Sequence, residues 1–170
     1  MTQKELVILA QQGNHDAFCA LYDERKTALY RYAYYKLGNE YDAQDAVSDT
    51  VLSAFVQIKE LKKAEAFNVW IFRILNASCN KYVKNQINAR QNMALDDAIN
   101  LTSSDRIPDG TVTDVNRALD LLSEQDREIV LLSAVSGFNS KEIAKITGFS
   151  HTAVRSRLSR ALARMRSALE

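Results

Sequence analysis

Residues 139–158 have the sequence NSKEIAKITGFSHTAVRSRL, and this stretch decides how the whole chain is interpreted. Asn139 can cap a first helix, with Glu142 at the reciprocal position of a capping box. Gly148 follows that helix where a turn favours a positive φ, and Ser150 can cap a second helix. Two short helices joined by a tight turn form a helix-turn-helix, and the sequence predicts one here.

The second helix of this motif has an apolar face and a polar face. Six apolar residues recur at helical spacing, namely Val154, Leu158, Ala161, Leu162, Met165 and Leu169. Arginines and small polar residues occupy other positions of this helix, namely Thr152, Arg155, Ser156, Arg157, Ser159, Arg160 and Arg164. Arginine can bind guanine through two hydrogen bonds or contact phosphates, and small polar residues suit entry into a major groove. The pattern indicates a DNA-binding helix; a solvated basic helix in a bundle is the alternative.

The charges are unevenly distributed although their total is nearly balanced. The chain has 22 Lys and Arg against 21 Asp and Glu, a net charge of +1. Residues 143–169 include six basic side chains and no acidic one, whereas residues 91–114 include five Asp and a single Arg. This asymmetry indicates a polyanionic partner for the C-terminal part of the chain.

Composition and periodicity predict an all-α protein with two small helical domains. A single Pro and five Gly leave little punctuation for many strands, and 46% of the 170 residues are hydrophobic. Helical spacing predicts one domain in residues 1–90 and a second in residues 115–170. Residues 91–114 lose this spacing and are rich in turn formers and acids, so they predict a flexible linker.

Within these domains, turn formers and caps predict where helices begin and end. Gly13 and the Gly38 region interrupt the helical spacing of the first domain. Asn14 and Asp42 can cap the helices that follow these breaks, and Ser123 can cap a helix of the second domain.

The sequence disfavours secreted proteins, membrane proteins and enzymes. Cys19 and Cys79 have no metal-ligand spacing, so we expect reduced thiols in a cytoplasmic protein with no metal and no cofactor. The N-terminus turns polar too early for a signal peptide, and no apolar run approaches the ~18 residues of a membrane span. His15 and His151 have no catalytic neighbours, and no Gly-rich phosphate loop is present, so we expect no enzymatic reaction.

With these motifs in place, the chain resembles the extracytoplasmic-function branch of the sigma-70 family over nearly its whole length. The first resembling block comprises residues 13–22 (GNHDAFCALY), 29–32 (LYRY), 42–52 (DAQDAVSDTVL) and 67–74 (FNVWIFRI). The second comprises residues 122–131 (LSEQDREIVL) followed by the helix-turn-helix. The resemblance implies that the first domain is sigma region 2 and the second is sigma region 4.

The resemblance also implies a protein that binds core RNA polymerase and directs it to promoters. In the family, the helix equivalent to residues 42–52 binds the clamp helices of the polymerase β′ subunit, and region 4 binds the β flap. The matching residues are Ala43, Gln44, Asp45, Val47, Ser48, Asp49 and Leu52, of which Asp45, Ser48, Asp49 and Leu52 are the expected contacts. Carboxylates beside apolar residues suit docking of a basic partner helix, and an ordinary solvated helix face is the alternative.

Promoter DNA is the second partner that the resemblance implies. The family captures a flipped base of the −10 element with a loop and the helix after it, where aromatic and cationic groups can offset the unstacking cost. The matching residues are Lys62, Lys63, Phe67 and Asn68 in the loop and Asn80, Lys81 and Lys84 on the helix. At the −35 element, the base and phosphate positions match Arg155, Ser156, Ser159 and Arg160. The sequence departs from the family at Ala77, Lys81 and Ala153, where the family has Asn, an acidic residue and Thr.

The remaining expectations concern other partners and other functions. By family habit we expect a sequestering anti-sigma factor and no stable homo-oligomer. The main alternative is a free-standing helix-turn-helix regulator, whose N-terminal part would dimerise or sense a partner. Such a regulator would bind a palindromic DNA site without polymerase. It would also give no binding role to the face formed by residues 42–52.

Overall fold

The computed structural model describes residues 1–94 and 110–170, and all the regular elements among them are helices, as predicted. The N-terminal unit contains α1 (Gln3–Gln11), α2 (His15–Leu37), α3 (Glu40–Gln57), η1 (Ile58–Glu60), η2 (Ala64–Ala66) and α4 (Phe67–Ala94). The C-terminal unit contains α5 (Gly110–Asp120), α6 (Glu124–Val130), the π-helical η3 (Leu131–Val135), α7 (Ser140–Thr147) and α8 (His151–Leu169).

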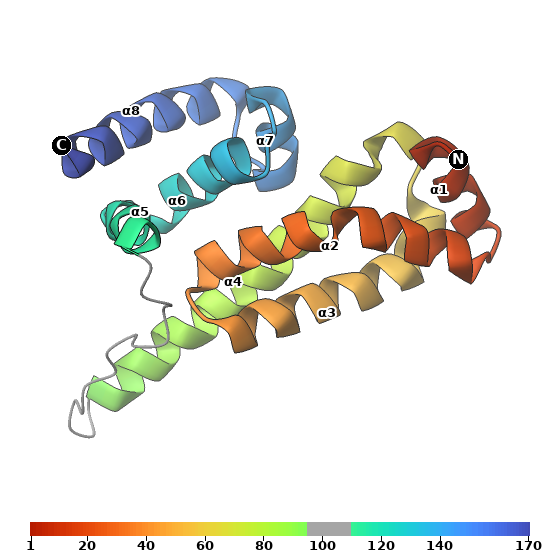
Figure 1. Ribbon diagram of the computed structural model, residues 1–170, viewed down its shortest axis with the longest axis horizontal. Helices are drawn as coiled ribbons and strands as arrows, with labels where there is room; N and C mark the ends of the chain where they lie inside the picture. The colour runs from red at the N-terminus through yellow and green to blue at the C-terminus, as the bar shows by residue number, and fades with distance from the viewer. Residues whose placement is uncertain (95–109) are drawn as a thin grey trace.

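In the N-terminal unit, α2, α3 and α4 are long helices that lie side by side, and α1 packs against one end of α2 (Figure 1). Large side chains from these helices are fully buried between them, including Leu21, Leu29, Tyr32, Phe67, Ile71 and Leu75. Each such side chain contributes about 1.5–3 kcal/mol of favourable transfer free energy when it leaves water. The long helices are therefore held by their shared core, which leaves their outer faces available for other contacts.

Side-chain caps determine where most of the helices begin. In six of them the N-cap side chain accepts a hydrogen bond from the backbone N–H three residues later; these caps are Thr2, Asn14, Asn39, Ser123, Asn139 and Ser150. The prediction of Asp42 as a cap is wrong. Asn39 takes that role and accepts the Asp42 N–H at 2.8 Å, while Asp42 lies in the first turn, where a negative charge favours the helix dipole.

The predicted linker, residues 91–114, is helical at both ends. Helix α4 continues to Ala94 and helix α5 begins at Gly110. The chain has no glycine or proline between Gly38 and Pro108, so nothing local stops α4 at residue 90. Residues 95–109 lie outside the described residues, and the domain boundaries at 90 and 115 remain predictions.

The two units pack against each other through their helices. Helix α7 lies against α4, and η3 lies against α2 (Figure 1). Phe138, in the turn before α7, meets Phe72 of α4 edge to face with 4.9 Å between ring centroids. Buried hydrophobic residues of both units belong to one continuous cluster. The described conformation is therefore a closed one, in which the C-terminal unit covers part of α2 and α4.

The remaining features of the described residues concern cysteines, membrane-spanning helices and metal sites. Cys19 is exposed and Cys79 is buried, and both are free thiols. Burial raises the pKa of the Cys79 thiol to about 12. Within residues 1–94 and 110–170, no helix is long and apolar enough to cross a bilayer. The same ranges contain no group of three or more His, Cys, Asp or Glu placed to hold a metal ion.

Candidate functional site

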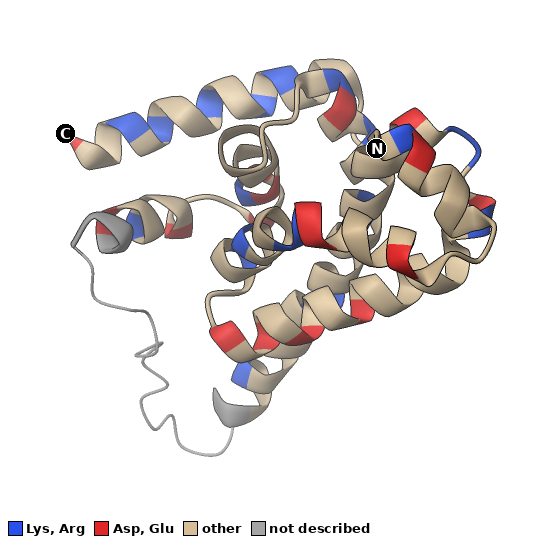
Figure 2. Ribbon diagram, turned by 45° about the vertical axis from the view of Figure 1, so that its right-hand side comes forward, with Lys and Arg blue, Asp and Glu red and all other residues tan. Residues whose placement is uncertain are grey.

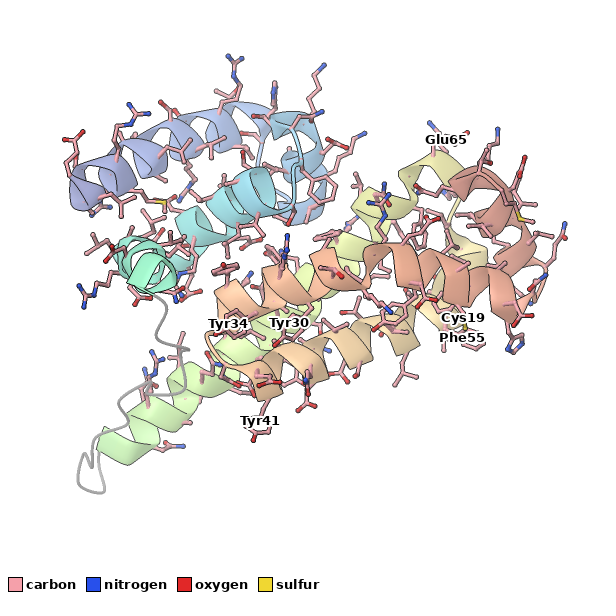
Figure 3. All side chains as sticks on the ribbon, viewed as in Figure 1. Cys19, Tyr30, Tyr34, Tyr41, Phe55 and Glu65 are labelled. Atoms are coloured by element: carbon pink, nitrogen blue, oxygen red, sulfur yellow. The ribbon has the colours of Figure 1, made fainter. Side chains whose placement is uncertain are left out.

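One face of α3 is exposed although much of it is apolar. Tyr41, Leu52 and Val56 are exposed on it, Leu52 at 66% and Val56 at 77% of full accessibility, and Figure 3 shows Tyr41 projecting away from the bundle. The four predicted contacts are exposed as well: Asp45, Ser48, Asp49 and Leu52. Residues 41, 45, 48, 52 and 56 follow helical spacing and share one side of α3. A solvated helix rarely keeps large apolar residues in such a row, so this face has the character of an interface.

Two residues assigned to this face by the sequence do not lie on it. Ala43 and Val47 are buried, because that side of α3 packs between α2 and α4. Two residues of the exposed face, Tyr41 and Val56, were missed by the sequence analysis. Two signals in the sequence could have identified them. Their helical spacing places them on the same side as Asp45, and apolar residues recur on both sides of the helix.

The electrostatics of α3 are acidic throughout. The helix contains Glu40, Asp42, Asp45 and Asp49 and has no Lys or Arg. Tyr82 of α4 donates a hydrogen bond to Asp49 Oδ2 at 2.8 Å. This hydrogen bond, followed by burial and the neighbouring carboxylates, raises the pKa of the Tyr82 phenol to about 12. A basic partner would therefore meet a face with several carboxylates and no competing cation of the same helix.

An open groove of about 670 Å³ continues this face onto α4. Helix α3 contributes Asp49, Leu52, Ser53 and Gln57, and α4 contributes Trp70, Arg73, Ile74, Ala77, Ser78 and Lys81. Trp70 is only partly buried, and its ring lies 6.0 Å from the buried ring of Phe67. The α4 side of the groove thus offers an aromatic ring and two cations, which are groups that bind single-stranded nucleic acid.

The loop before α4 presents two lysines but not the predicted aromatic ring. Lys62 and Lys63 are exposed. Phe67 was predicted to line this loop, and that is wrong because its side chain is completely buried and supports the loop from the core. Asn68 is partly buried and exchanges hydrogen bonds with Gln3 of α1, 3.4 Å each. The loop is therefore cationic on its surface and anchored beneath.

The predicted DNA contacts on α4 are exposed, but one of them is engaged within the protein. Asn80, Lys81 and Lys84 are exposed on α4. The Asn80 side-chain oxygen accepts a hydrogen bond from Lys36 Nζ of α2 at 2.7 Å. Ala77, which stands where the family has Asn, is exposed and lines the groove. Of the α4 positions discussed for −10 recognition, Ala77 and Lys81 line the groove, whereas Asn80 and Lys84 do not.

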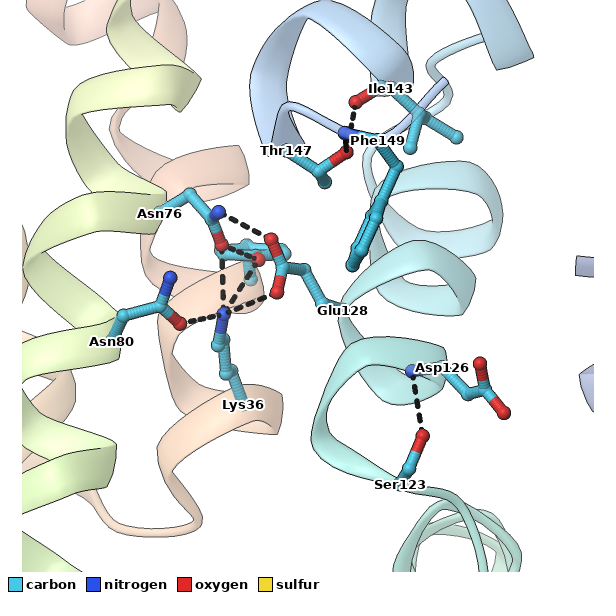
Figure 4. Close-up of polar contacts among 10 residues, drawn as sticks. Lys36, Asn76, Asn80, Ser123, Asp126, Glu128, Ile143, Thr147 and Phe149 are labelled. Atoms are coloured by element: carbon cyan, nitrogen blue, oxygen red, sulfur yellow. Dashed lines mark hydrogen bonds and ion pairs between the residues drawn. The ribbon is translucent and has the colours of Figure 1, made fainter. Parts of the chain in front are cut away.

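A buried polar cluster joins the two units, and the sequence analysis did not find it. Lys36 is 3% exposed and Glu128 of α6 is 8% exposed, with 3.5 Å between Nζ and Oε2 (Figure 4). Asn76 of α4 bridges them: its Oδ1 accepts from Lys36 at 2.8 Å and its Nδ2 donates to Glu128. Tyr32 also donates to Asn76 Oδ1. Burial lowers the pKa of the Lys36 ammonium, and the Glu128 carboxylate opposes that change.

The helix-turn-helix forms as the sequence predicts. Helix α7 ends at Gly148, whose φ of 85° lies in the left-handed region that favours glycine. Thr147 Oγ1 donates to the Ile143 carbonyl at 2.8 Å in the last turn of α7. Ile143 and Val154 are completely buried where the two helices meet. The turn is therefore fixed by its own residues, and it determines the direction of α8.

Helix α8 carries its polar face outward. Figure 2 shows basic residues recurring along this helix, which ends at the C-terminus, and the helix contains five Arg and no acidic residue. The exposed residues among those predicted to contact DNA are Thr152, Arg155, Ser156, Ser159, Arg160 and Arg164. The predicted apolar stripe is only partly correct, because Leu162 and Leu169 are exposed.

Arg157 differs from the other arginines of α8. It is only partly exposed, and its guanidinium donates to Asp126 Oδ1 of α6 at 3.0 Å. The guanidinium also lies over the Phe149 ring, 5.2 Å from the centroid. These contacts tie α8 to α6 and to the turn, so Arg157 holds the helix in position from within the unit.

Comparison with known proteins gives concordant matches for both units. The model described as Sigma-70 region 2 matches residues 21–87, and the one described as Sigma-70, region 4 matches residues 113–165. The ECF RNA polymerase sigma factor BldN of Streptomyces coelicolor is 29% identical over 95% of this chain, which spans 64% of that relative's length.

Two solved structures resemble the whole arrangement. CnrH in complex with the cytosolic domain of CnrY has a TM-score of 0.76 and 27% identity, over 98% of this chain and 96% of that one. The sigma factor RpoE in complex with the anti-sigma factor NepR from Bartonella quintana has a TM-score of 0.65 and 25% identity, over 86% of this chain and 94% of that one.

Proposed function

Since the chain belongs to the sigma-70 family and is an RNA polymerase sigma factor of the extracytoplasmic-function type, we propose that it binds core polymerase through α3 and directs it to −10 and −35 promoter elements. One observation carries this proposal: the chain presents an acidic, partly apolar helix in one unit and a basic helix-turn-helix in the other. The protein acts by binding alone and supplies specificity to the polymerase reaction.

The α3 face is the surface for the β′ clamp helices. Leu52 and Val56 offer apolar area that contributes affinity when it leaves water, and Tyr41 adds an aromatic ring at the other end of the face. Asp45 and Asp49 supply carboxylates that complement a basic partner helix and orient it. The face therefore combines an apolar centre with charges that select the partner.

The −10 element meets the groove between α3 and α4 and the loop before α4. Lys62 and Lys63 supply positive charge for the DNA backbone, and Lys81 extends it along α4. Trp70 offers a partly exposed ring at the groove, against which an unstacked base can pack. Ala77 leaves room in that groove where the family has a larger polar residue, so the preferred base differs from that of relatives with Asn.

The −35 element is read by α8 in the major groove. Arg155, Ser156, Ser159 and Arg160 are exposed on the first turns of that helix, which are the turns that face base edges in a helix-turn-helix. Arg157 acts indirectly, because it holds α8 against α6. Two weakly binding units become selective together because the polymerase holds both at a fixed spacing and raises their effective concentration.

The other partners follow from the same function. A second surface of the C-terminal unit binds the β flap, and an anti-sigma factor sequesters the protein when transcription is not required. The anti-sigma factor NepR in complex with RpoE supports this second expectation. The protein works in the cytoplasm, where polymerase and chromosomal DNA are located.

Transcription in vitro tests the proposal. Purified protein and core RNA polymerase are incubated with fragmented genomic DNA from the source organism, and transcript 5′ ends are mapped with and without the protein. We expect a small set of new start sites that share two upstream motifs. Core polymerase alone is the control. Unaltered start sites, together with no association between the protein and core polymerase, would overturn the proposal.

A further inference from the structure

The buried polar cluster lies where the C-terminal unit packs against α2 and α4, beside Asn80, a predicted DNA-binding residue of the N-terminal unit. Lys36 and Asn76 belong to α2 and α4, whereas Glu128 belongs to α6, 52 residues beyond Asn76 along the chain. The same Lys36 ammonium binds the side-chain oxygen of Asn80, a residue expected at the −10 element. The two units therefore share buried charges next to a surface that DNA would need.

Burial makes this cluster specific to the closed arrangement. A buried ammonium or carboxylate is costly unless it is paired and hydrogen-bonded. Among the described residues, the ion-pair partner of Lys36 is Glu128, which belongs to the other unit. If the units separate, water can solvate both charges. The ion pair between Lys36 and Glu128 thus stabilises the closed form. In the open form, each unit keeps its own charge solvated by water.

Promoter geometry requires a more extended arrangement than the closed one. The −10 and −35 elements are about 25 base pairs apart, which is about 85 Å at a rise of ~3.4 Å per base pair. Packed helices have axes about 8–10 Å apart, and α7 lies against both α4 and α8, so α8 begins within about 20 Å of α4. Helix α8 is only about 28 Å long, so its far end also stays well short of 85 Å.

We infer that Lys36, Asn76 and Glu128 form an interdomain latch that keeps the unbound sigma factor closed and must open before both units engage one promoter. The inference rests on the proposed function, since only simultaneous binding at two elements requires the opening. Phe72 and Phe138 add an apolar contact beside the interdomain latch. Polymerase or DNA that binds the open form shifts the population toward it. The free energy needed to open the latch is subtracted from the binding free energy.

Distance measurements in the free, full-length protein test the interdomain latch without any polymerase. Spin labels are attached to the native, exposed Cys19 on α2 and to an exposed position of α8 through Ser167→Cys. Cys79 is buried and its pKa is raised to about 12, so it reacts slowly. Pulsed electron paramagnetic resonance then gives the distance distribution between the units.

Two variants break the interdomain latch from opposite sides. Glu128→Gln removes the charge of the C-terminal unit, and Lys36→Met removes that of the N-terminal unit while keeping a long side chain. We expect one narrow distance distribution in the parent protein and a broadened, shifted distribution in both variants. Glu65→Gln is the control, because it removes a carboxylate from an exposed ion pair within the N-terminal unit. Circular dichroism must show unchanged helix content in all of them.

The same proteins separate failure of the inference from failure of the proposed function. Opening raises the binding-competent fraction, so the apparent Kd for core polymerase should fall about tenfold or more in Glu128→Gln, and not in Glu65→Gln. A distance distribution that stays as narrow as the parent's in both latch variants overturns the inference whatever the polymerase does. Normal opening with no binding of core polymerase by any of the proteins overturns the proposed function instead, and with it the role given to the opening.

Discussion

Helices α3 and α8 are both charged and exposed along one side, but their exposed sides differ in sign and in apolar content. Helix α3 has four carboxylates and no base, with Tyr41, Leu52 and Val56 exposed among them. Helix α8 has five arginines and no acid, with small serines between them. Apolar area beside carboxylates favours a protein partner, whereas arginines beside small polar residues favour phosphates and base edges. The difference supports the proposal that one chain divides polymerase binding and DNA reading between two helices.

The largest expected effect is a loss of polymerase binding when Leu52 of α3 is changed. Leu52→Asp places a charge at the apolar centre of the proposed docking face, where truncation of a hot-spot residue costs about 2 kcal/mol or more, roughly 30-fold in Kd. Binding to core polymerase, measured by biolayer interferometry, should fall by at least that factor. Folding should be unaffected because Leu52 is exposed.

Ile8→Asp on α1 is the matched control, since Ile8 is also an exposed large hydrophobic residue but lies on another helix. Equal losses from the two changes would mean that α3 has no special role in docking.

Arg160→Ala should weaken the DNA binding proposed for α8. Arg160 is exposed on α8, and its removal should weaken binding to a promoter with a −35 element by about 1–3 kcal/mol, while binding to core polymerase stays unchanged. Electrophoretic mobility shifts with reconstituted holoenzyme measure this loss. Arg31→Ala, an exposed arginine of α2, is the control and should have little effect. Full promoter binding by Arg160→Ala would remove α8 from the −35 assignment.

Equivalent caps allow the two units to be weakened equally. Asn39 and Asn139 each accept a backbone N–H, from Asp42 at 2.8 Å and from Glu142 at 2.9 Å. Asn39→Ala and Asn139→Ala should each cost about 1 kcal/mol and lower the thermal midpoint by roughly 2–4 °C. Calorimetry measures both. If only one substitution lowers the thermal midpoint, the helix it caps depends on its local sequence for stability. The other helix is then stabilised mainly by packing.

The smallest expected effect is a change in the pKa of Tyr82 beside the acidic helix α3. The hydrogen bond to Asp49 raises the pKa of Tyr82 to about 12, so Asp49→Asn should bring that pKa down toward 10. Because the raised pKa belongs to the folded state, the stability from this contact is complete below pH 10 and is lost as the pH rises toward 12. Carbon-13 NMR of the tyrosine rings follows the titration. An unchanged Tyr82 pKa would mean that Asp49 does not hold the phenol in solution.

The features predicted well from the sequence are those that depend on neighbouring residues. The turn at Gly148 and the caps Asn139 and Ser150 are local, and each lies where the sequence places it. The exposed face of α3 was predicted in part, because helical spacing identifies which residues share a side. The spacing alone does not say which side is buried, and for that reason Ala43 and Val47 were assigned to the wrong one.

The features missed depend on contacts between distant parts of the chain. Phe67 is an aromatic residue beside a lysine-rich loop, and only the packing of α4 shows that its ring is buried. Lys36, Asn76 and Glu128 have no common motif and come from three helices, so the sequence gives no signal that they meet. A lysine on a helix normally lies in solvent, and its burial here becomes visible only when both units are placed together.

Hydroxyl-radical footprinting of the reconstituted holoenzyme on a promoter found by start-site mapping tests the division of labour between α3 and α8 most directly. We predict two protected segments about 25 base pairs apart, with the upstream one lost in Arg160→Ala and both lost in Leu52→Asp, because that variant no longer joins the polymerase. Protection of the same segments by the purified protein without core polymerase, or two segments that persist in both variants, would contradict the account.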